Sequence, residues 1–239
     1  MAEASPDNRS TNPLPSFITL REMFDCETEP KCSKFFKTET IDLNGICEKL
    51  RSGKKNEVWY NLRLGEEAYI STRETPQKLE ENDILIIRPG EFAQLTTYES
   101  LTVPNDYVGF ISMRFTPKSR GLINVSGFQV DPGFTGHLIF SVYNAGPRDV
   151  AFRFKEELFI ILFARISTPV HESFYGRTTE IPNIPVELIA SMHGAPISLP
   201  DLDMKVKRLS DQMKLFAIVL TGLISALIAL AVGLLAPHG

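Results

Sequence analysis

Residues 130–146 read VDPGFTGHLIFSVYNAG and contain the clearest structural signals in the chain. Asp131, Pro132 and Gly133 are typical of a tight turn, because proline fixes φ near −65° and glycine tolerates a positive φ. Residues 137–143 then have the composition of a β-strand. The stretch therefore predicts a turn that leads into a strand, and the same alternation of strands and turns continues on both sides of it.

The flanking sequence is rich in short apolar runs that are separated by Gly, Pro, Asn and Asp. Polar and apolar residues alternate over residues 151–154, as expected for a half-buried strand. Residues 41–51, followed by Gly53, predict a helix with a glycine C-cap. We find no internal repeat. Further strands are expected at residues 83–87, 107–113, 150–154 and 158–166. Many short strands with regular turns predict a mainly β fold, a sandwich or a jelly roll.

Composition narrows the possible functions. The chain has 239 residues, of which 43 % are apolar and 23 % charged, and its net charge is −4 with a pI near 5.7. There is no basic tract that would neutralise a nucleic-acid backbone, so a nucleic-acid polymer is not an expected partner. Met1 to Ser16 contain no apolar signal-peptide core and are rich in polar residues, which predicts disorder.

The three cysteines, Cys26, Cys32 and Cys47, lie close together near the beginning of the sequence. An odd, sparse set is not typical of a disulfide framework, and the Cys26–Cys32 spacing without a second pair is a poor zinc motif. We therefore expect these cysteines to have structural or incidental roles in a reducing compartment.

Residues 215–235 read LFAIVLTGLISALIALAVGLL, which is 21 residues without a charge. A helix of that length spans about 31 Å, the thickness of a bilayer core. The alternative is a buried core helix. Basic residues precede the segment: Lys205, Lys207, Arg208 and Lys214. They predict a single-pass, tail-anchored protein with its N-terminal domain in the cytoplasm and membrane lipid as a partner.

The segment before this span has the pattern of a coiled coil. Ser198, Pro200 and Asp201 are typical of a helix start. Apolar residues then follow at spacings of 4, 3 and 4, which is a heptad seam. The seam residues are Leu202, Val206, Leu209 and Met213. An amphipathic helix on the membrane surface is the alternative. Ser225, Ala229 and Gly233 form a row of small residues suited to helix packing in lipid.

These patterns divide the chain into successive parts. We expect a disordered N-terminus, a β domain, a linker, an amphipathic stalk and a transmembrane helix. The predicted boundaries are residues 1–16, 17–178, 179–200, 201–214 and 215–235.

The globular part resembles the dCTP deaminase/dUTPase family, also called the trimeric dUTPase superfamily. The matching runs, in family order and spacing, are residues 61–65 (NLRLG), 88–93 (RPGEFA), 98–100 (YES), 103–109 (VPNDYVG), 130–137 (VDPGFTGH) and 143–146 (YNAG). The resemblance implies a distorted jelly roll, or β-clip, that forms a homotrimer. It also implies a deoxynucleotide triphosphate site between subunits, with Mg²⁺ carried by the triphosphate and no protein-bound metal.

The resemblance assigns a phosphate-binding run to residues 114–120, which read RFTPKSR. In the family this run is Arg-Ser-Ser followed by a second Arg. Phe115 replaces the first serine and cannot donate a hydrogen bond, whereas Thr116 can. Ser119 stands at the later arginine position. The nucleotide-binding residues implied by the resemblance are Arg114, Thr116, Lys118, Ser119, Arg120, Gln129 and Tyr143. An inter-subunit ion pair is the alternative role for Arg114.

Two positions decide the expected chemistry. Deamination in this family needs a Glu as proton shuttle, and Ser141 occupies that position; a serine hydroxyl is too weakly acidic to act alone as a general base. dUTP hydrolysis needs an Asp to activate water, and Asp131 matches it, although a turn role explains Asp131 equally well. The family's Gln in the last core strand is Ile161. No glycine-rich C-terminal arm is found, and residues 174–177 resemble the deaminase lid only weakly. His137 is expected to be structural.

Three functions are compatible with these residues. The first, which we favour, is a membrane-anchored, catalytically degenerate trimer that binds a nucleotide or a partner as a scaffold or signalling module. The second is an active dCTP deaminase or dUTP pyrophosphatase (a hydrolase of pyrimidine deoxynucleotide metabolism) that uses Asp131. The third is a structural trimer without a ligand.

Overall fold

The computed structural model describes residues 16–24, 34–53, 58–171, 183–192 and 199–235. The described strands are β1 (Ser16–Phe17), β2 (Tyr60–Ile70), β3 (Gln77–Lys78), β4 (Ile84–Ile87), β5 (Phe92–Thr102), β6 (Tyr107–Met113), β7 (Leu122–Asn124), β8 (Gln129–Val130), β9 (Thr135–Asn144), β10 (Val150–Arg153) and β11 (Glu157–Arg165). The helices are α1 (Leu20–Phe24), α2 (Leu43–Arg51), α3 (Phe115–Ser119), α4 (Val186–Met192) and α5 (Leu199–Leu235), with a 3₁₀ turn at Thr38–Thr40.

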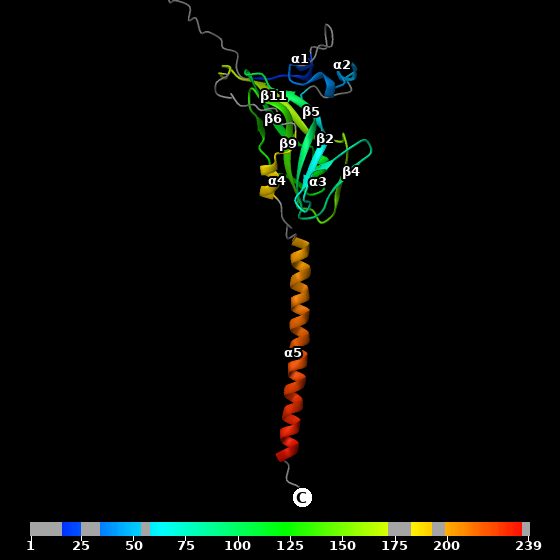
Figure 1. Cartoon of the computed structure of the whole chain (residues 1–239), viewed down its shortest axis with the longest axis vertical. Helices are drawn as coiled ribbons and strands as arrows, with labels where there is room; N and C mark the ends of the chain where they lie inside the picture. Colours follow the sequence, from blue (N-terminus) through cyan, green and yellow to red (C-terminus); the bar gives the residue numbers. More distant parts are fainter. Residues whose placement is uncertain (1–15, 25–33, 54–57, 172–182, 193–198, 236–239) are drawn as a thin grey trace, which may run out of the picture. The chain divides into compact units, whose positions relative to one another are not determined.

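Contacts divide the chain into two units, residues 1–196 and 197–239, which are described separately. The first unit is a curled antiparallel sheet with the strand order β7-β9-β5-β2-β11-β6-β8 (Figure 1). Strand β1 pairs with β11, β3 pairs with β2, and β4 and β10 form a separate two-stranded sheet. The prediction of a mainly β jelly-roll-like domain is confirmed, including the predicted strand at Tyr107–Met113.

The core of this unit is aromatic and lies inside the curled sheet. Phe140 and Phe159 stack with ring centroids 3.6 Å apart, and Phe35 packs on Phe163 at 4.5 Å. All four rings are buried. Burial of each such ring contributes roughly 1.5–3 kcal/mol to folding.

The alternation of residues along β9 determines which face of this strand points to the core. Leu138, Phe140 and Val142 are buried, whereas His137, Ile139 and the other odd-numbered side chains are only half-buried. Side chains alternate across a strand, so the even-numbered positions of β9 face the core and the odd-numbered positions face outward.

Helix α2 confirms the predicted helix and its C-terminal glycine. The Asp42 carboxylate accepts a hydrogen bond from the Gly45 N–H at 3.0 Å, which caps the first turn. Gly53 has φ of +67° and follows the last turn, where its N–H donates to the Leu50 carbonyl at 3.2 Å. Glycine suits this position because it adopts positive φ without steric cost.

A disulfide at Cys47 was not expected from the sequence. Cys47 lies in α2, is fully buried and takes part in a disulfide. Cys26 and Cys32 lie outside the described residues. Disulfides are uncommon in reducing compartments. This bond therefore weighs against the predicted reducing compartment.

The second unit contains one continuous helix, α5. Within it, Leu202–Ala231 passes a test of length and composition for a helix that could cross a bilayer. Its most apolar 18-residue window has a mean hydropathy of 2.3, and no part of that window is buried. By its length and composition, α5 is therefore a candidate membrane span. The seam residues Leu202, Val206, Leu209 and Met213 are all exposed in the single chain.

Candidate functional site

Asp131 occupies the first position of a type II turn. Its carbonyl accepts a hydrogen bond from the Phe134 N–H at 3.2 Å, and Gly133 has φ of +82°. The Asp131 side chain is exposed, and Oδ1 accepts a hydrogen bond from Gln129 Nε2 at 3.1 Å. The turn accounts for the Asp-Pro-Gly sequence, and it leaves the carboxylate available to solvent.

Arg114 pairs with an acidic residue of its own chain. Its Nη1 atom lies 2.5 Å from Glu157 Oε2 on β11. Both side chains line a cavity of about 310 Å³, together with Thr116 and Arg120. The structure thus brings three of the predicted nucleotide-binding residues of this run, Arg114, Thr116 and Arg120, to one cavity. The inter-subunit ion pair considered from the sequence stays a prediction, since the structure holds a single chain.

The remaining residues of the run make local contacts. Lys118 Nζ donates to Ser112 Oγ at 2.9 Å, and Ser119 Oγ donates to the Thr116 carbonyl at 2.9 Å. Phe115, which replaces the first family serine, is 82 % exposed. Neither Lys118 nor Ser119 lines the cavity.

Ser141 lies on the outward face of β9. It pairs directly with Gln94 on β5, while its carbonyl accepts from the Val125 N–H at 2.8 Å. Directly opposed residues share one face of a sheet, so Gln94 is its nearest cross-strand neighbour. Its neighbours on the same face of β9 are Ile139 and Tyr143. None of these described side chains carries a carboxylate that could replace the missing Glu.

The other predicted site residues lie elsewhere in the sheet. Tyr143 is on the same face as Ser141, and its ring lies 4.6 Å from that of Phe92. Ile161 is fully buried in β11, so the position of the family's Gln belongs to the core. Ser141 lies six residues beyond Thr135, the start of β9, which is roughly 20 Å along a strand. Within one chain, therefore, the Asp131 turn and Ser141 are far apart along β9.

A buried ion pair was not identified from the sequence. Glu99 is fully buried, and it accepts hydrogen bonds from Arg63 N at 2.8 Å and Arg63 Nε at 2.7 Å. Tyr60 Oη donates to the same carboxylate at 3.4 Å. Burial raises the pKa of the Glu99 carboxyl, against the opposing effect of Arg63. Burial and the nearby Glu99 also raise the pKa of Tyr60, so its hydroxyl remains a donor.

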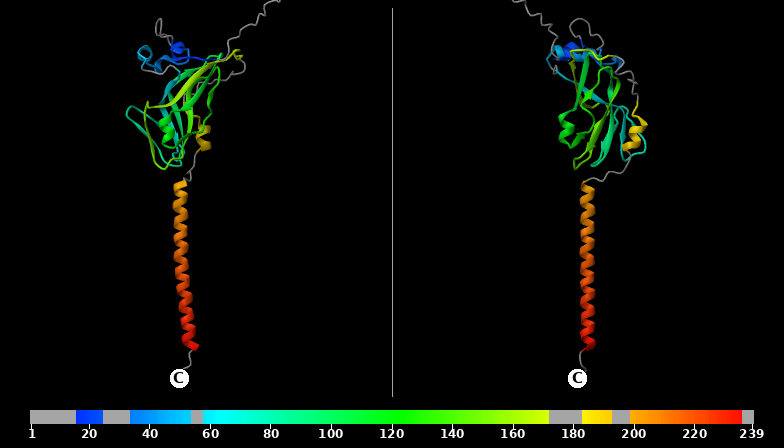
Figure 2. Two further views of the ribbon diagram at one scale, coloured as in Figure 1. Left: turned by 180° about the vertical axis from the view of Figure 1, so that it is seen from behind. Right: turned by 90° about the vertical axis from the view of Figure 1, so that its left-hand side faces the viewer.

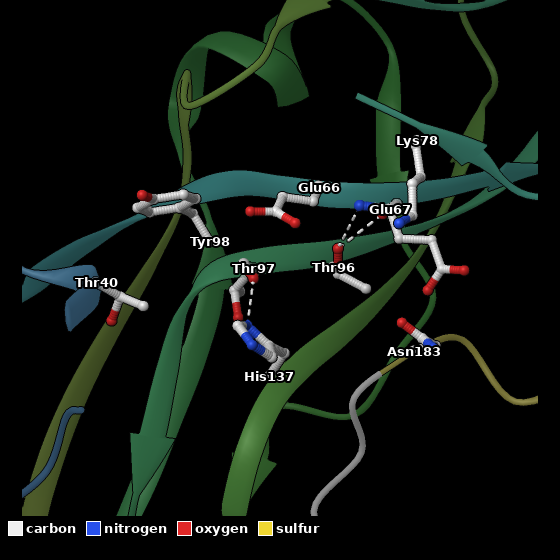
Figure 3. A pocket seen from close by; sticks show the side chains of 9 residues that line it. All are labelled: Thr40, Glu66, Glu67, Lys78, Thr96, Thr97, Tyr98, His137 and Asn183. Atoms are coloured by element: carbon white, nitrogen blue, oxygen red, sulfur yellow. Dashed lines mark hydrogen bonds between the residues drawn. The ribbon is translucent and has the colours of Figure 1, made fainter. Parts of the chain in front are cut away.

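A second cavity, polar and of about 240 Å³, lies beside two neighbouring β-bulges, one in β2 and one in β5 (Figure 3). The β2–β5 pairing moves from Leu64↔Thr97 to Ala68↔Leu95, so three residues of β2 oppose one of β5. Gly65 fits at this bulge because a Cβ atom there would lie 2.6 Å from the Thr97 carbonyl oxygen. A bulge of this kind redirects nearby side chains out of the regular pleat.

His137 stabilises the neighbouring bulge in β5. Its Nδ1 atom lies 2.8 Å from the Thr97 carbonyl oxygen, and a carbonyl can only accept, so Nδ1 carries the proton (Figure 3). Thr97 Oγ1 accepts from the Leu138 N–H at 3.0 Å and donates to the Glu99 carbonyl at 2.8 Å. His137 thus satisfies a backbone group that the bulge releases. This arrangement agrees with the expected structural role.

No group of three or more His, Cys, Asp or Glu side chains suited to a metal ion occurs among the described residues. The weakly lid-like residues 174–177 lie outside them.

Comparison with known proteins identifies the class of domain. The model of the dCTP deaminase-like family matches residues 37–166. A dCTP deaminase of Pyrococcus abyssi is 33 % identical over 117 residues, which cover 49 % of this chain and 74 % of that protein. A dCTP deaminase of Idiomarina loihiensis is 34 % identical over 100 residues, covering 41 % of this chain and 51 % of that protein. The chain thus spans about half the length of the latter relative.

Solved structures show the same likeness at lower identity. The 2′-deoxycytidine 5′-triphosphate deaminase of Agrobacterium tumefaciens gives a TM-score of 0.40 at 16 % identity, covering 51 % of this chain and 47 % of that one. The EIAV dUTPase gives a TM-score of 0.34 at 14 % identity, covering 48 % of this chain and 92 % of that one. On the match to residues 37–166, the chain belongs to the dCTP deaminase-like family.

Proposed function

We propose that this chain is a membrane-anchored, homotrimeric member of the family that binds a pyrimidine deoxynucleotide triphosphate without deaminating it. The observation that carries the proposal is the environment of Ser141. Its hydroxyl stands where the family has a Glu, and its neighbours in the sheet are Gln94, Ile139 and Tyr143. Without an ionisable group the proton transfer of deamination loses on the order of 10²–10⁴ in rate.

Retention of nucleotide binding is supported by the cavity that holds Arg114, Thr116 and Arg120. Two guanidinium groups and a hydroxyl suit the oxygens of a triphosphate. Mg²⁺ would arrive with the triphosphate, since such ions are held mainly by phosphates and water. The trimer with bound nucleotide would then act as a signalling or scaffold module.

Assembly into a trimer is supported by two apolar surfaces. An aromatic row runs over the outer side of the first unit: Phe17 and Phe110 are 5.9 Å apart between ring centroids, and Phe110 and Phe128 are 6.3 Å apart. Phe17 and Phe128 are more than half exposed. Exposed apolar patches of this kind mark contact surfaces. The exposed α5 seam is the second surface, and three parallel copies would bury it.

Membrane attachment through α5 is supported by the apolar part of this helix, whose most apolar 18-residue window has a mean hydropathy of 2.3. The basic residues Lys205, Lys207, Arg208 and Lys214 favour a cytoplasmic location for the first unit. The Cys47 disulfide favours an oxidising compartment instead. Protease accessibility of the first unit in sealed membrane vesicles distinguishes the two orientations.

An active dUTP pyrophosphatase is the second candidate, because the Asp131 carboxylate is exposed and hydrogen-bonded to Gln129. Calorimetry on the full chain in detergent micelles, with dCTP or dUTP and Mg²⁺, tests the proposal. Micromolar or tighter binding is expected. Absence of binding to both nucleotides would favour a purely structural trimer, and hydrolysis that disappears in Asp131→Ala would favour the second candidate.

A further inference from the structure

A strap, residues 183–192, lies against the outward face of β2, β5 and β9. It consists of Asn183, Ile184, Pro185 and α4, and Figure 2 shows α4 alongside the sheet of the first unit. The Ile184 N–H donates to Glu67 Oε2 at 2.6 Å, and Gln94 Nε2 lies 2.8 Å from Met192 Sδ. The strap is therefore fixed at both ends to side chains of this face.

Gln94 lies under the strap in an unfavourable environment. Its side chain is fully buried, and among the described residues its Oε1 atom has no hydrogen-bond partner. Its amide nitrogen is directed at a thioether, which is a weak acceptor. A buried amide that is so poorly satisfied costs folding free energy, and this suggests that the amide has another partner in another state.

Gln94 is the centre of a row that crosses three strands. It pairs with Tyr69 on β2 and with Ser141 on β9. Tyr69 is also fully buried, yet it lies outside the main core cluster. An aromatic ring, a carboxamide and a hydroxyl therefore follow one another at strand spacing, over about 10 Å. These groups suit a flat polar ring, which the aromatic side chain packs against and the amide recognises at its edge.

We propose that Gln94 recognises the edge of the pyrimidine ring in this chain, and that the strap covers Gln94 until a nucleotide displaces it. This inference rests on the proposed nucleotide binding. A carboxamide presents one donor and one acceptor. In one orientation it matches N3 and the 4-amino group of cytosine, and after a 180° rotation it matches N3–H and O4 of uracil. The ligand class is thus pyrimidine nucleotides, with little preference between cytosine and uracil.

The strap is suited to displacement because it is held by few buried contacts. No side chain of α4 is buried, and Val186 is 73 % exposed. Ile184 is the buried apolar anchor. Segments with so little buried surface open at low cost relative to the core.

The change in hydrogen exchange of the strap on nucleotide binding distinguishes a displaced cover from a lid that closes on its ligand. A lid that closes on its ligand becomes protected from hydrogen exchange, whereas a displaced cover becomes less protected. The test measures amide exchange of residues 183–192 in the full chain in detergent micelles, with and without saturating dCTP or dUTP and Mg²⁺. We expect faster exchange in the strap with either nucleotide. Slower or unchanged exchange at saturation would overturn the proposal.

Variants provide a second measurement. Gln94→Met keeps the volume and removes the amide, and we expect about tenfold weaker binding of both nucleotides, equivalent to about 1.4 kcal/mol. Met192→Ala should tighten binding several-fold, and Gln212→Met on α5 is the matched control. Unchanged affinity in Gln94→Met with normal wild-type binding would overturn only this inference. Absence of wild-type binding would overturn the proposed function and this inference together.

Discussion

Arg114 and Glu157 form an ion pair inside the cavity that carries the predicted phosphate contacts. Besides the 2.5 Å contact between Arg114 Nη1 and Glu157 Oε2, the same nitrogen donates to the Glu157 carbonyl at 3.3 Å. Asn61 Nδ2 donates to the same carboxylate oxygen at 2.8 Å. A triphosphate that uses Arg114 must therefore compete with Glu157 for the guanidinium.

Replacing Glu157 with Gln should strengthen triphosphate binding. The pair is about 40 % exposed on both sides, and such pairs contribute at most about 1 kcal/mol, so a two- to fivefold lower Kd is expected. Calorimetry with dUTP and Mg²⁺ measures it. Glu81→Gln, which removes another exposed acidic partner, is the control and should leave the Kd unchanged. A weaker complex in Glu157→Gln would mean that Glu157 supports the site and does not compete.

Loss of Arg63 should destabilise the first unit strongly. Arg63→Met leaves the fully buried Glu99 without its cation, and such changes cost about 3–5 kcal/mol. Denaturant unfolding of the full chain in micelles, followed by fluorescence of the single tryptophan Trp59, measures the change. Glu81→Gln breaks an exposed pair and should cost less than 1 kcal/mol. Equal effects of the two variants would contradict the importance of the buried pair.

Because the pKa of Glu99 is raised in the folded state, its contribution to the free energy of unfolding should decrease as the pH rises. Between the unfolded pKa, about 4.3, and the higher folded pKa, the folded state holds more protons than the unfolded state. The contribution of Glu99 is therefore full at low pH and is lost as the pH rises through the folded pKa. The free energy of unfolding of the wild type minus that of Glu99→Gln should fall over this range and then level off. A difference that rises with pH would show a depressed pKa.

The α5 seam should control assembly. Val206→Asp together with Leu209→Asp places charges among residues that three helices would bury, and we expect the trimer to dissociate to monomers. Ser210→Asp, one position outside the seam, should leave the trimer intact. Sedimentation in density-matched detergent distinguishes the two masses. A trimer that persists in the double variant would mean that the first unit assembles without the stalk.

Sequence patterns predicted the elements that are marked by local signals, such as a capping residue, a C-terminal glycine or a turn. Helix α2 has its cap at Asp42 and its glycine at Gly53, and β9 has a turn before it. Strand β5 was not predicted from periodicity, because it is buried on both faces over most of its length and has no alternation. Strand β2 contains a bulge between Leu64 and Ala68, so its alternation of inward and outward side chains is not continuous along the strand.

The contacts within the candidate site depend on pairs that are far apart in the sequence. The turn at Asp131 could be predicted from three adjacent residues. The Arg114–Glu157 pair, the Glu99–Arg63 pair and the Gln94–Ser141 row each join residues that only strand register brings together. Register depends on the whole sheet, so none of them follows from local pattern.

Turnover is the most direct test of the account. The full chain in micelles is incubated with dCTP or dUTP and Mg²⁺, and the formation of dUTP, dUMP and pyrophosphate is followed by chromatography, with Asp131→Ala in parallel. The account predicts bound nucleotide, no hydrolysis of dUTP, and deamination of dCTP at least about 100-fold slower than the roughly 1 s⁻¹ typical of enzymes. Deamination of dCTP at a rate typical of enzymes, roughly 1 s⁻¹ or more, would show that another carboxylate serves the position of Ser141 and would contradict the account.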